Sequence, residues 1–338
     1  MIARNDTTIS NGEGGSMELV LPLAHFRLQL QAQTPIHFHH YSGSAWRGLF
    51  GHALRQVACV TGERDCRGCL LYRSCVYAYI FETPASPDSQ FMRRADAVPH
   101  PFVLFPEFDL RHLKPGDCTS LDLILAGSAV EKLPYIVHAM ATAGERGVGA
   151  GEGRYKLVGV SQAARLGGDR WCEIHGDDGL QPLPADFPVV PALPERVVID
   201  FQSPLRLRYK GRMLSPEYFH FGGLVANLLR RYSMMSYFHA GKEVDLDFKG
   251  LVAQAAEVDH RQADLRWYSW RRYSSRQSRA VSMGGVMGRV TYDANDIAPF
   301  WPLLWLGQWL HLGKGTSMGL GRYHIVQASG AEQIDAAA

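Results

Sequence analysis

Two stretches of the chain alternate apolar and polar residues, a pattern typical of strands with one buried face. They are "HFRLQLQAQTPIHF" over residues 25–38 and "VVIDFQSPLRLRYK" over residues 197–210, and a proline interrupts each of them. A segment with apolar residues at three-to-four spacing follows each stretch, over residues 42–60 and 215–235. Each segment begins with a serine that can cap a helix. The pattern therefore predicts a strand followed by a helix, twice along the chain.

A second pair of similar stretches lies late in each half. "GEGRYKLV" at 151–158 and "GLGRYHIV" at 319–326 both place Gly-x-Gly-Arg-Tyr before an apolar run that predicts a strand. Two elements that recur in the same order at nearly the same separation indicate an internal repeat. A dinucleotide-binding loop is excluded, because that fingerprint follows a first strand and opens a helix, whereas both of these motifs precede strands.

We therefore predict an α+β fold of two tandem ferredoxin-like (RRM-like) domains, each strand–helix–strand–strand–helix–strand with a glycine-rich loop before its last strand. The N-terminal domain is expected over residues 17–175 and the C-terminal domain over residues 196–328. The proline-rich segment 176–195 is predicted to be the linker between them. Residues 1–16 are polar and rich in glycine and serine, so we expect them to be disordered, and residues 329–338 form a tail.

Composition limits the partners that the chain can have. The 338 residues are 46% hydrophobic and 20% charged, which fits a globular protein, and the formal net charge is only +2. Contact with a nucleic acid would therefore have to come from local basic patches. The sequence contains neither an apolar run of about 18 residues nor the apolar core of a signal peptide, so we expect a cytoplasmic protein with no membrane partner.

Three motifs carry a resemblance to a known family. "AWRGLFGHALR" (45–55), "RYSSRQSRAVSMGGVMGRVTY" (272–292) and "HLGKGTSMGLGRYHI" (311–325) are similar, in this order, to motifs of the RAMP superfamily of CRISPR proteins. Within it the chain resembles the Cas-six group, the endoribonucleases that cut CRISPR precursor RNA within its repeats. The resemblance spans roughly residues 20–328 and implies CRISPR repeat RNA as the partner.

The resemblance also implies a cut that needs no catalytic metal. Protein groups would deprotonate a ribose 2′-OH, stabilise the charged phosphorane and protonate the leaving oxygen, giving a 2′,3′-cyclic phosphate and a 5′-OH. Members of the group commonly use a histidine near the first helix, and histidine titrates close to neutral pH. We expect His52, inside the helix motif, to be the general base or acid. His40 or His39, in the preceding loop, is expected as its partner, and Tyr41 is a further candidate.

A basic window is expected to bind the RNA. Between residues 261 and 289 the chain has seven arginines and one acidic residue, interleaved with tryptophan and tyrosine. Guanidinium groups match phosphate oxygens, and aromatic rings can stack on unpaired bases. Glycines allow positive φ angles and close backbone approach, so the glycine-rich loop is expected to contact the RNA backbone. The predicted RNA-binding residues are Arg47, Arg271, Arg272, Arg276, Arg279, Lys314 and Arg322, with Gly313, Gly315, Gly319 and Gly321.

Four of the six cysteines, Cys59, Cys66, Cys69 and Cys75, form a cysteine-rich insertion at 59–75 in the first domain. Because no secretion signal is present, metal ligation is favoured over disulfides. Four thiolates suit a structural zinc ion, and four protein ligands leave no open position for catalysis. An iron–sulfur cluster and reduced, unligated thiols are the alternatives.

Two other functions remain open from the sequence. The chain could be a non-catalytic RAMP subunit that binds guide RNA together with other CRISPR effector subunits. A zinc-containing RNA-binding protein outside CRISPR systems is a third interpretation, and the paired halves with RAMP-like motifs disfavour it.

Overall fold

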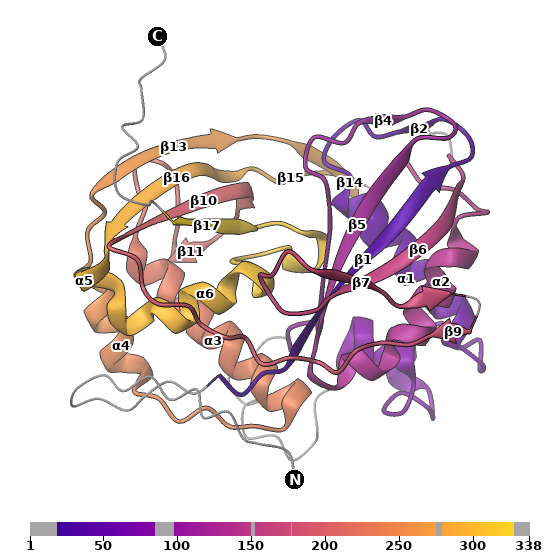
Figure 1. Cartoon of the computed structure of the whole chain (residues 1–338), viewed down its shortest axis with the longest axis horizontal. Coiled ribbons are helices and arrows are strands. Elements are labelled where there is room, and N and C mark those ends of the chain that lie inside the picture. Colours follow the sequence, from indigo (N-terminus) through magenta and orange to yellow (C-terminus); the bar gives the residue numbers. More distant parts are fainter. Residues whose placement is uncertain (1–18, 85–97, 150–152, 177, 275–278, 328–338) are drawn as a thin grey trace.

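The computed structural model describes residues 19–84, 98–149, 153–176, 178–274 and 279–327. The protein is an α+β molecule with two antiparallel sheets, one in each half of the chain (Figure 1). The predicted disordered start at 1–16 and the tail at 329–338 lie outside the described residues. No helix in the described part is both long enough and apolar enough to cross a membrane.

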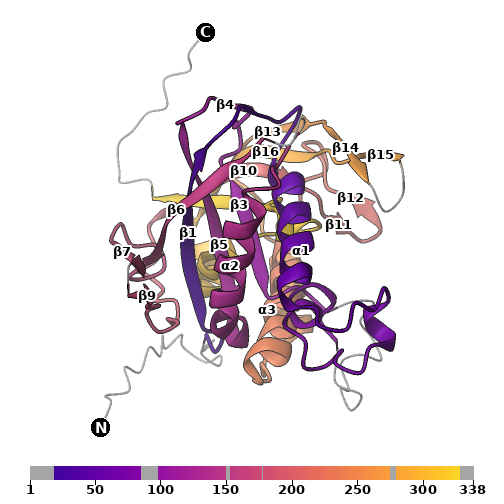
Figure 2. The same ribbon diagram turned by 90° about the vertical axis from the view of Figure 1, so that its right-hand side faces the viewer.

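The first sheet has the strand order β3-β5-β1-β6-β7, and all of its pairs are antiparallel. Two helices lie side by side on one of its faces (Figure 2). The repeated strand pattern forms the central strand, β1. The elements are β1 (Leu23–Ala32), α1 (Gly43–Ala58), β3 (Phe102–Pro106), β5 (Cys118–Ala126), α2 (Leu133–Ala143), β6 (Tyr155–Ala163) and β7 (Trp171–Glu173).

The second sheet has the order β13-β16-β10-β17 and is also antiparallel. Its central strand, β10, is the other repeated strand pattern, so the two patterns occupy equivalent places in the two sheets. The elements are β10 (Arg196–Leu205), α3 (Phe221–Ala240), α4 (Phe248–Ala256), β13 (Gln262–Tyr268), β16 (Gly285–Asp293), α5 (Ala294–Ile297), α6 (Trp301–Leu310) and β17 (Tyr323–Gln327).

Short hairpins and single turns complete the described structure. The hairpins pair β8 (His175–Gly176) with β9 (Gly179–Leu180), β11 (Arg208–Tyr209) with β12 (Arg212–Met213), and β14 (Arg271–Ser274) with β15 (Arg279–Ser282). A further two-stranded sheet joins β2 (Ile36–His37) to β4 (His112–Leu113), which lies far along the chain. The turns are η1 (Cys66–Gly68), η2 (Ala78–Glu82), η4 (Gly127–Lys132), η5 (Ala298–Phe300) and η6 (Thr316–Met318).

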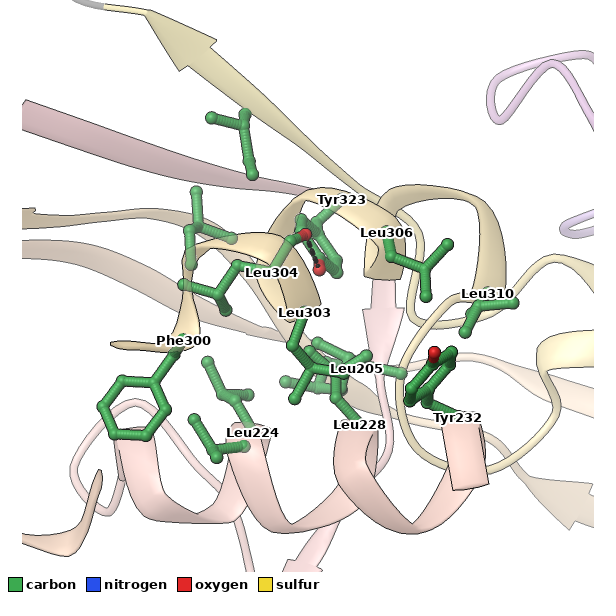
Figure 3. Close-up of a cluster of buried hydrophobic side chains, with 14 of the residues drawn as sticks. Leu205, Leu224, Leu228, Tyr232, Phe300, Leu303, Leu304, Leu306, Leu310 and Tyr323 are labelled. Carbon is green, nitrogen blue, oxygen red and sulfur yellow. Dashed lines mark hydrogen bonds between the residues drawn. The ribbon is translucent and has the colours of Figure 1, made fainter. Parts of the chain in front are cut away.

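Helix α6 is apolar on all sides and is therefore buried between α3 and the second sheet. Leu303 of α6 packs towards Leu224 and Leu228 of α3 (Figure 3). On the sheet side, the buried hydroxyl of Tyr323 in β17 donates a hydrogen bond of 2.6 Å to the backbone oxygen of Leu304. This contact fixes the last strand, and with it the end of the glycine-rich loop, against the core.

The structure differs from the sequence pattern in two places. The pattern predicts the second helix over 215–235, but α3 begins at Phe221, because Ser215 and Tyr218 pair their backbones in a turn before it. Helix α3 also continues past residue 235, to Ala240. Within the segment predicted as the linker, Asp186 exchanges two backbone hydrogen bonds of 2.9 Å with Leu23 at the start of β1.

The two halves share one hydrophobic core. Leu23, Val103 and Ile124 of the first sheet join the buried cluster that is formed mainly by α3, α6 and the second sheet. At its edge, His239 near the end of α3 lies against the first half. Its Nε2 donates to the backbone oxygen of Pro99 at 2.8 Å, and its Nδ1 accepts from the Tyr79 hydroxyl at 3.1 Å.

His239 should make the stability of the protein depend on pH. Burial lowers its pKa from 6.5 to about 4. The unfolded chain therefore binds more protons than the folded one between these values, and stability is lost as the pH falls through this window. From pH 7 to pH 5 this group should cost about 2 kcal/mol of unfolding free energy.

Urea denaturation at both pH values measures this loss. His239→Gln should be less stable at pH 7 but should lose about 2 kcal/mol less on acidification than the wild type. The exposed His138→Gln is the matched control and should keep the wild-type difference. An unchanged pH dependence in His239→Gln would contradict the assignment.

Candidate nucleic-acid interface

The glycines of the 311–322 loop are required by the fold itself. Gly313, Gly315, Gly319 and Gly321 have φ angles of 77°, 86°, 86° and 69°, in the left-handed region that favours glycine. A Cβ atom at Gly319 would overlap the Tyr41 hydroxyl, and a Cβ at Gly321 would overlap the backbone oxygen of Leu312. The loop therefore passes too close to its neighbours for any side chain at these two positions.

Hydrogen bonds join the start of helix α1 to this loop. The buried Tyr41 hydroxyl donates to the backbone oxygen of Met318 at 2.9 Å, and Arg47 Nε donates to Ser317 Oγ at 2.9 Å. Gly43, in the first turn of α1, lies so close to the backbone oxygen of Met318 that a Cβ atom at this position would overlap it. Two motifs that lie about 270 positions apart in the sequence are thus joined in one surface. Burial raises the pKa of Tyr41, so its hydroxyl stays protonated as a donor.

Arg47 also contacts His100, a residue that the sequence motifs do not include. Arg47 Nη2 donates to His100 Nε2 at 3.2 Å, and Thr83 Oγ1 lies 3.4 Å from His100 Nδ1. Burial and the neighbouring Arg47 lower the pKa of His100 to about 4, so the ring is neutral at pH 7. His100 follows residues 85–97, which lie outside the description, and no spacing or motif in the sequence distinguishes it.

The histidines before α1 lie on an exposed edge. Ile36 and Phe38 are buried, while His37, His39 and His40 are exposed. The expected alternation of this segment is therefore present. His37 Nδ1 lies 2.6 Å from the Nδ1 atom of His112 across the two-stranded β2–β4 sheet, a pairing that no sequence signal indicated.

His52 lies in a different place from His39 and His40. It belongs to an exposed stripe of α1 with Gly48 and Gln56, which are spaced four residues apart as one helix face requires. At about 1.5 Å per residue it lies about 13 Å along the helix from Gly43. His52 therefore lies more than two helical turns from the start of α1, whereas His39 and His40 precede that start.

The arginine-rich hairpin β14–β15 begins beside the glycine-rich loop. Trp270 is only 5% exposed and packs in a small cluster with Tyr41, Met283, Met318 and Leu320. Trp267, in contrast, is 44% exposed. Of the four hairpin arginines predicted to bind RNA, Arg271 is exposed, Arg272 and Arg279 belong to β14 and β15, and Arg276 lies outside the described residues.

The two cations of the glycine-rich loop occupy different surroundings. Lys314 is exposed, and its backbone N–H donates to the carbonyl oxygen of Arg206 at 2.8 Å. Arg322 is half-buried, with its guanidinium carbon 4.5 Å from the centre of the Phe105 ring.

The four clustered cysteines line one small cavity at the end of α1, in a loop with a single 3₁₀ turn. All six cysteines of the chain are free thiols. Within the described ranges, however, no group of three or more His, Cys, Asp or Glu side chains is arranged to hold a metal ion. The predicted zinc site is therefore not supported, and the segment 59–75 does not stand out as a separate unit. Burial raises the pKa of the Cys66 thiol, whereas a backbone hydrogen bond from Gly62 lowers the pKa of the Cys59 thiol.

Comparisons with known proteins match both halves of the chain. A family model described as CRISPR-associated endoribonuclease Cas6 matches residues 199–323, and a model described as an N-terminal domain matches residues 21–183. No curated protein matches the chain.

Solved structures share the fold. A Cas6 product complex is 16% identical, with a TM-score of 0.52, over 90% of this chain and 99% of that one. A partial Cas6-RT-Cas1–Cas2 complex is 13% identical, with a TM-score of 0.52, over 94% of this chain and 48% of that one. At these identities the likeness establishes a common architecture of two antiparallel sheets.

Proposed function

Because the chain belongs to the CRISPR-associated endoribonuclease Cas6 family, we propose that it binds CRISPR repeat RNA and cleaves precursor crRNA by attack of a ribose 2′-OH. The observation that carries the proposal is the junction of two family-like motifs, in which Arg47 of α1 holds Ser317 of the glycine-rich loop. This junction is open to solvent at Lys314 and adjoins the arginine-rich hairpin. Anion-binding backbone, an exposed lysine and arginines thus lie on neighbouring elements.

The architecture of each half is consistent with this role. Both halves run strand–helix–strand–strand–helix–strand, and in both the first strand lies between the third and the fourth. We assign the ferredoxin-like plan to both halves on this basis. Helices cover one face of each sheet, and the other face of the first sheet is buried against the second half at Leu23, Val103 and Ile124.

A histidine on α1 suits the proton transfer best. A general base must come within about 2.6–3.2 Å of the 2′-OH proton, so the catalytic histidine must lie beside the scissile phosphate. His52 is exposed, and one turn before it Gly48 has open space where a side chain would lie. RNA backbone can therefore approach the helix closely at this point. We assign His52 as general base or acid and keep His40 and His39 as the alternative pair.

The other predicted residues would position the RNA. Tyr41 and Arg47 are engaged by the glycine-rich loop, so they would act by holding that loop in place. Lys314 and the hairpin arginines would neutralise phosphate charge. Other CRISPR effector subunits remain proposed partners of the same surface.

The test is a cleavage assay on labelled CRISPR repeat RNA in excess EDTA. The expected result is one cut that leaves a 2′,3′-cyclic phosphate and a 5′-OH. Tight, repeat-specific binding without any cut would instead support a non-catalytic RNA-binding subunit. Cleavage that EDTA abolishes would show that a metal ion takes part and would overturn the proposed chemistry.

Replacing Arg271 and Arg272 together by alanine should weaken repeat RNA binding roughly tenfold or more, which corresponds to about 1.4 kcal/mol. The slope of log affinity against log salt should fall by about 0.7 for each phosphate that the protein no longer neutralises. Arg165→Ala with Arg170→Ala removes two exposed arginines at the β6–β7 turn and is the control. Equal affinities for both double variants would place the RNA away from the hairpin.

A further inference from the structure

A cavity of about 200 Å³ lies where the two halves meet. Its walls come from the end of β3 and the residues that follow it, from β10, and from the glycine-rich loop. Pockets for drug-sized molecules enclose roughly 300–1,000 Å³, so this one suits a single planar ring system. A water molecule needs only about 10–15 Å³ of such space, so the cavity is larger than a structural water site requires.

One wall carries an unpaired cation. The Arg322 guanidinium lies over the Phe105 ring, and among the described residues it has no hydrogen-bond or ion-pair partner. The buried carboxylate of Asp122 already has two partners: its Oδ2 lies 3.3 Å from His25 Nε2, and its Oδ1 lies 2.7 Å from Arg27 Nε. A half-buried guanidinium face without a partner is a stacking surface for a flat π-system.

The remaining walls are aromatic or neutral and polar. Tyr41 and Phe108 present two rings whose centres are 5.4 Å apart. Ser203 is fully used by the fold, since its Oγ donates to the oxygen of Gly319 at 2.7 Å and accepts from the N–H of Arg322 at 2.8 Å. The side chain of Gln202 is half-buried, and it has no hydrogen bond within the described structure. Its amide can therefore donate to and accept from one edge of a ligand.

The charges at the rim of the cavity favour a nucleobase over a phosphate as its ligand. Glu107 and Asp109 line the cavity and are exposed, so two carboxylates and one cation, Arg322, face its interior. Asp109 is also paired with Arg111, which lies outside the lining and whose Nη2 is 3.9 Å from Asp109 Oδ1. This balance disfavours an anion. The same carboxylates accept hydrogen bonds from amino groups and ring N–H groups, which nucleobases carry on their edges.

We propose that this cavity holds one unpaired nucleobase of the bound RNA, stacked at the Arg322–Phe105 face and read at its edge by Gln202, Glu107 and Asp109. An exocyclic amino group offers two N–H donors where uracil offers only its N3–H, so acceptors at the rim favour a base with an amino group over uracil. This inference rests on the proposed RNA-binding function and adds to it a base-specific site outside the region assigned to the cut.

The experiment combines base removal with protein variants. Repeat RNAs with one abasic nucleotide at each position in turn are measured for affinity to the wild-type protein and to Gln202→Ala. Removing the base at one position should weaken binding to the wild type about 5- to 150-fold, as a stacking contribution of about 1–3 kcal/mol implies. At that position the penalty should shrink several-fold in Gln202→Ala, whereas Gln254→Ala, which removes an exposed amide on α4, should keep it.

A second variant keeps the test independent of one side chain. Glu107→Gln with Asp109→Asn retains the shape of the rim and removes its charge. It should reduce several-fold the discrimination against uracil at the sensitive position. Normal binding and cutting of the repeat, with the same abasic profile in every variant, would overturn the cavity assignment and leave the proposed function standing. Absence of specific repeat binding by the wild type would overturn both.

Discussion

His52→Ala should slow single-turnover cleavage of repeat RNA about 10²- to 10⁴-fold, the usual contribution of a positioned general acid or base. The affinity for RNA should change little, because the imidazole lies on an exposed helix face and supports no part of the core. The rate is measured with protein in excess over labelled RNA, and affinity is measured separately on RNA whose 2′-OH at the cut is replaced by hydrogen.

His39→Ala and His40→Ala are matched controls, since both histidines are exposed and lie before the same helix. Each should retain cleavage within a few-fold of the wild type. A large loss in either, with normal cleavage in His52→Ala, would move the cut to the start of α1 beside the glycine-rich loop. That result would contradict the assignment of His52 without affecting the proposed reaction.

Gly321→Ala should lower the free energy of unfolding by about 3 kcal/mol or more. A left-handed conformation costs a residue with a side chain about 1–2 kcal/mol, and relieving an overlap by backbone shifts costs about 1–3 kcal/mol. Both penalties apply here, because Gly321 has φ 69° and its Cβ would overlap the Leu312 carbonyl oxygen. Urea denaturation followed by circular dichroism measures the loss.

Gly116→Ala separates the two penalties. Gly116 has φ 90° but open space around it, so the substitution should cost only about 1–2 kcal/mol. Equal losses in the two variants would show that the crossing of the loop over Leu312 is looser than the structure indicates.

The sequence was sufficient for the strands and helices whose patterns are local. The alternation around Phe26 and around Ile199 follows from one buried sheet face, and these stretches form the two central strands. The predicted start of α3 was wrong because a turn between Ser215 and Tyr218 competes with the helix for the same backbone groups. Such competition depends on geometry that propensities do not contain.

The candidate site was predictable only in part. The glycine-rich loop and the helix motif could be identified because spacing and composition mark them, and the structure joins them. How far His52 lies from His39 depends on where α1 begins and on the path of the residues before it. The sequence pattern specified neither. His100 and the contact of Arg322 with Phe105 link positions far apart in sequence, and no periodicity predicts such contacts. Nor can cysteine spacing alone establish that the four thiols converge on an ion.

The shared core of the two halves has a consequence for how substrates are chosen. Domains that meet through a small polar contact can close around a ligand, but here Leu23, Val103 and Ile124 continue the core of the other half. The spacing between the glycine-rich loop, the hairpin and α1 is thus set before RNA arrives. For repeat RNA bound as proposed, we expect one nucleotide too many or too few between its contacts to weaken binding, because the shared core holds the described parts of the two halves together. The length of the RNA would then be part of what the protein selects.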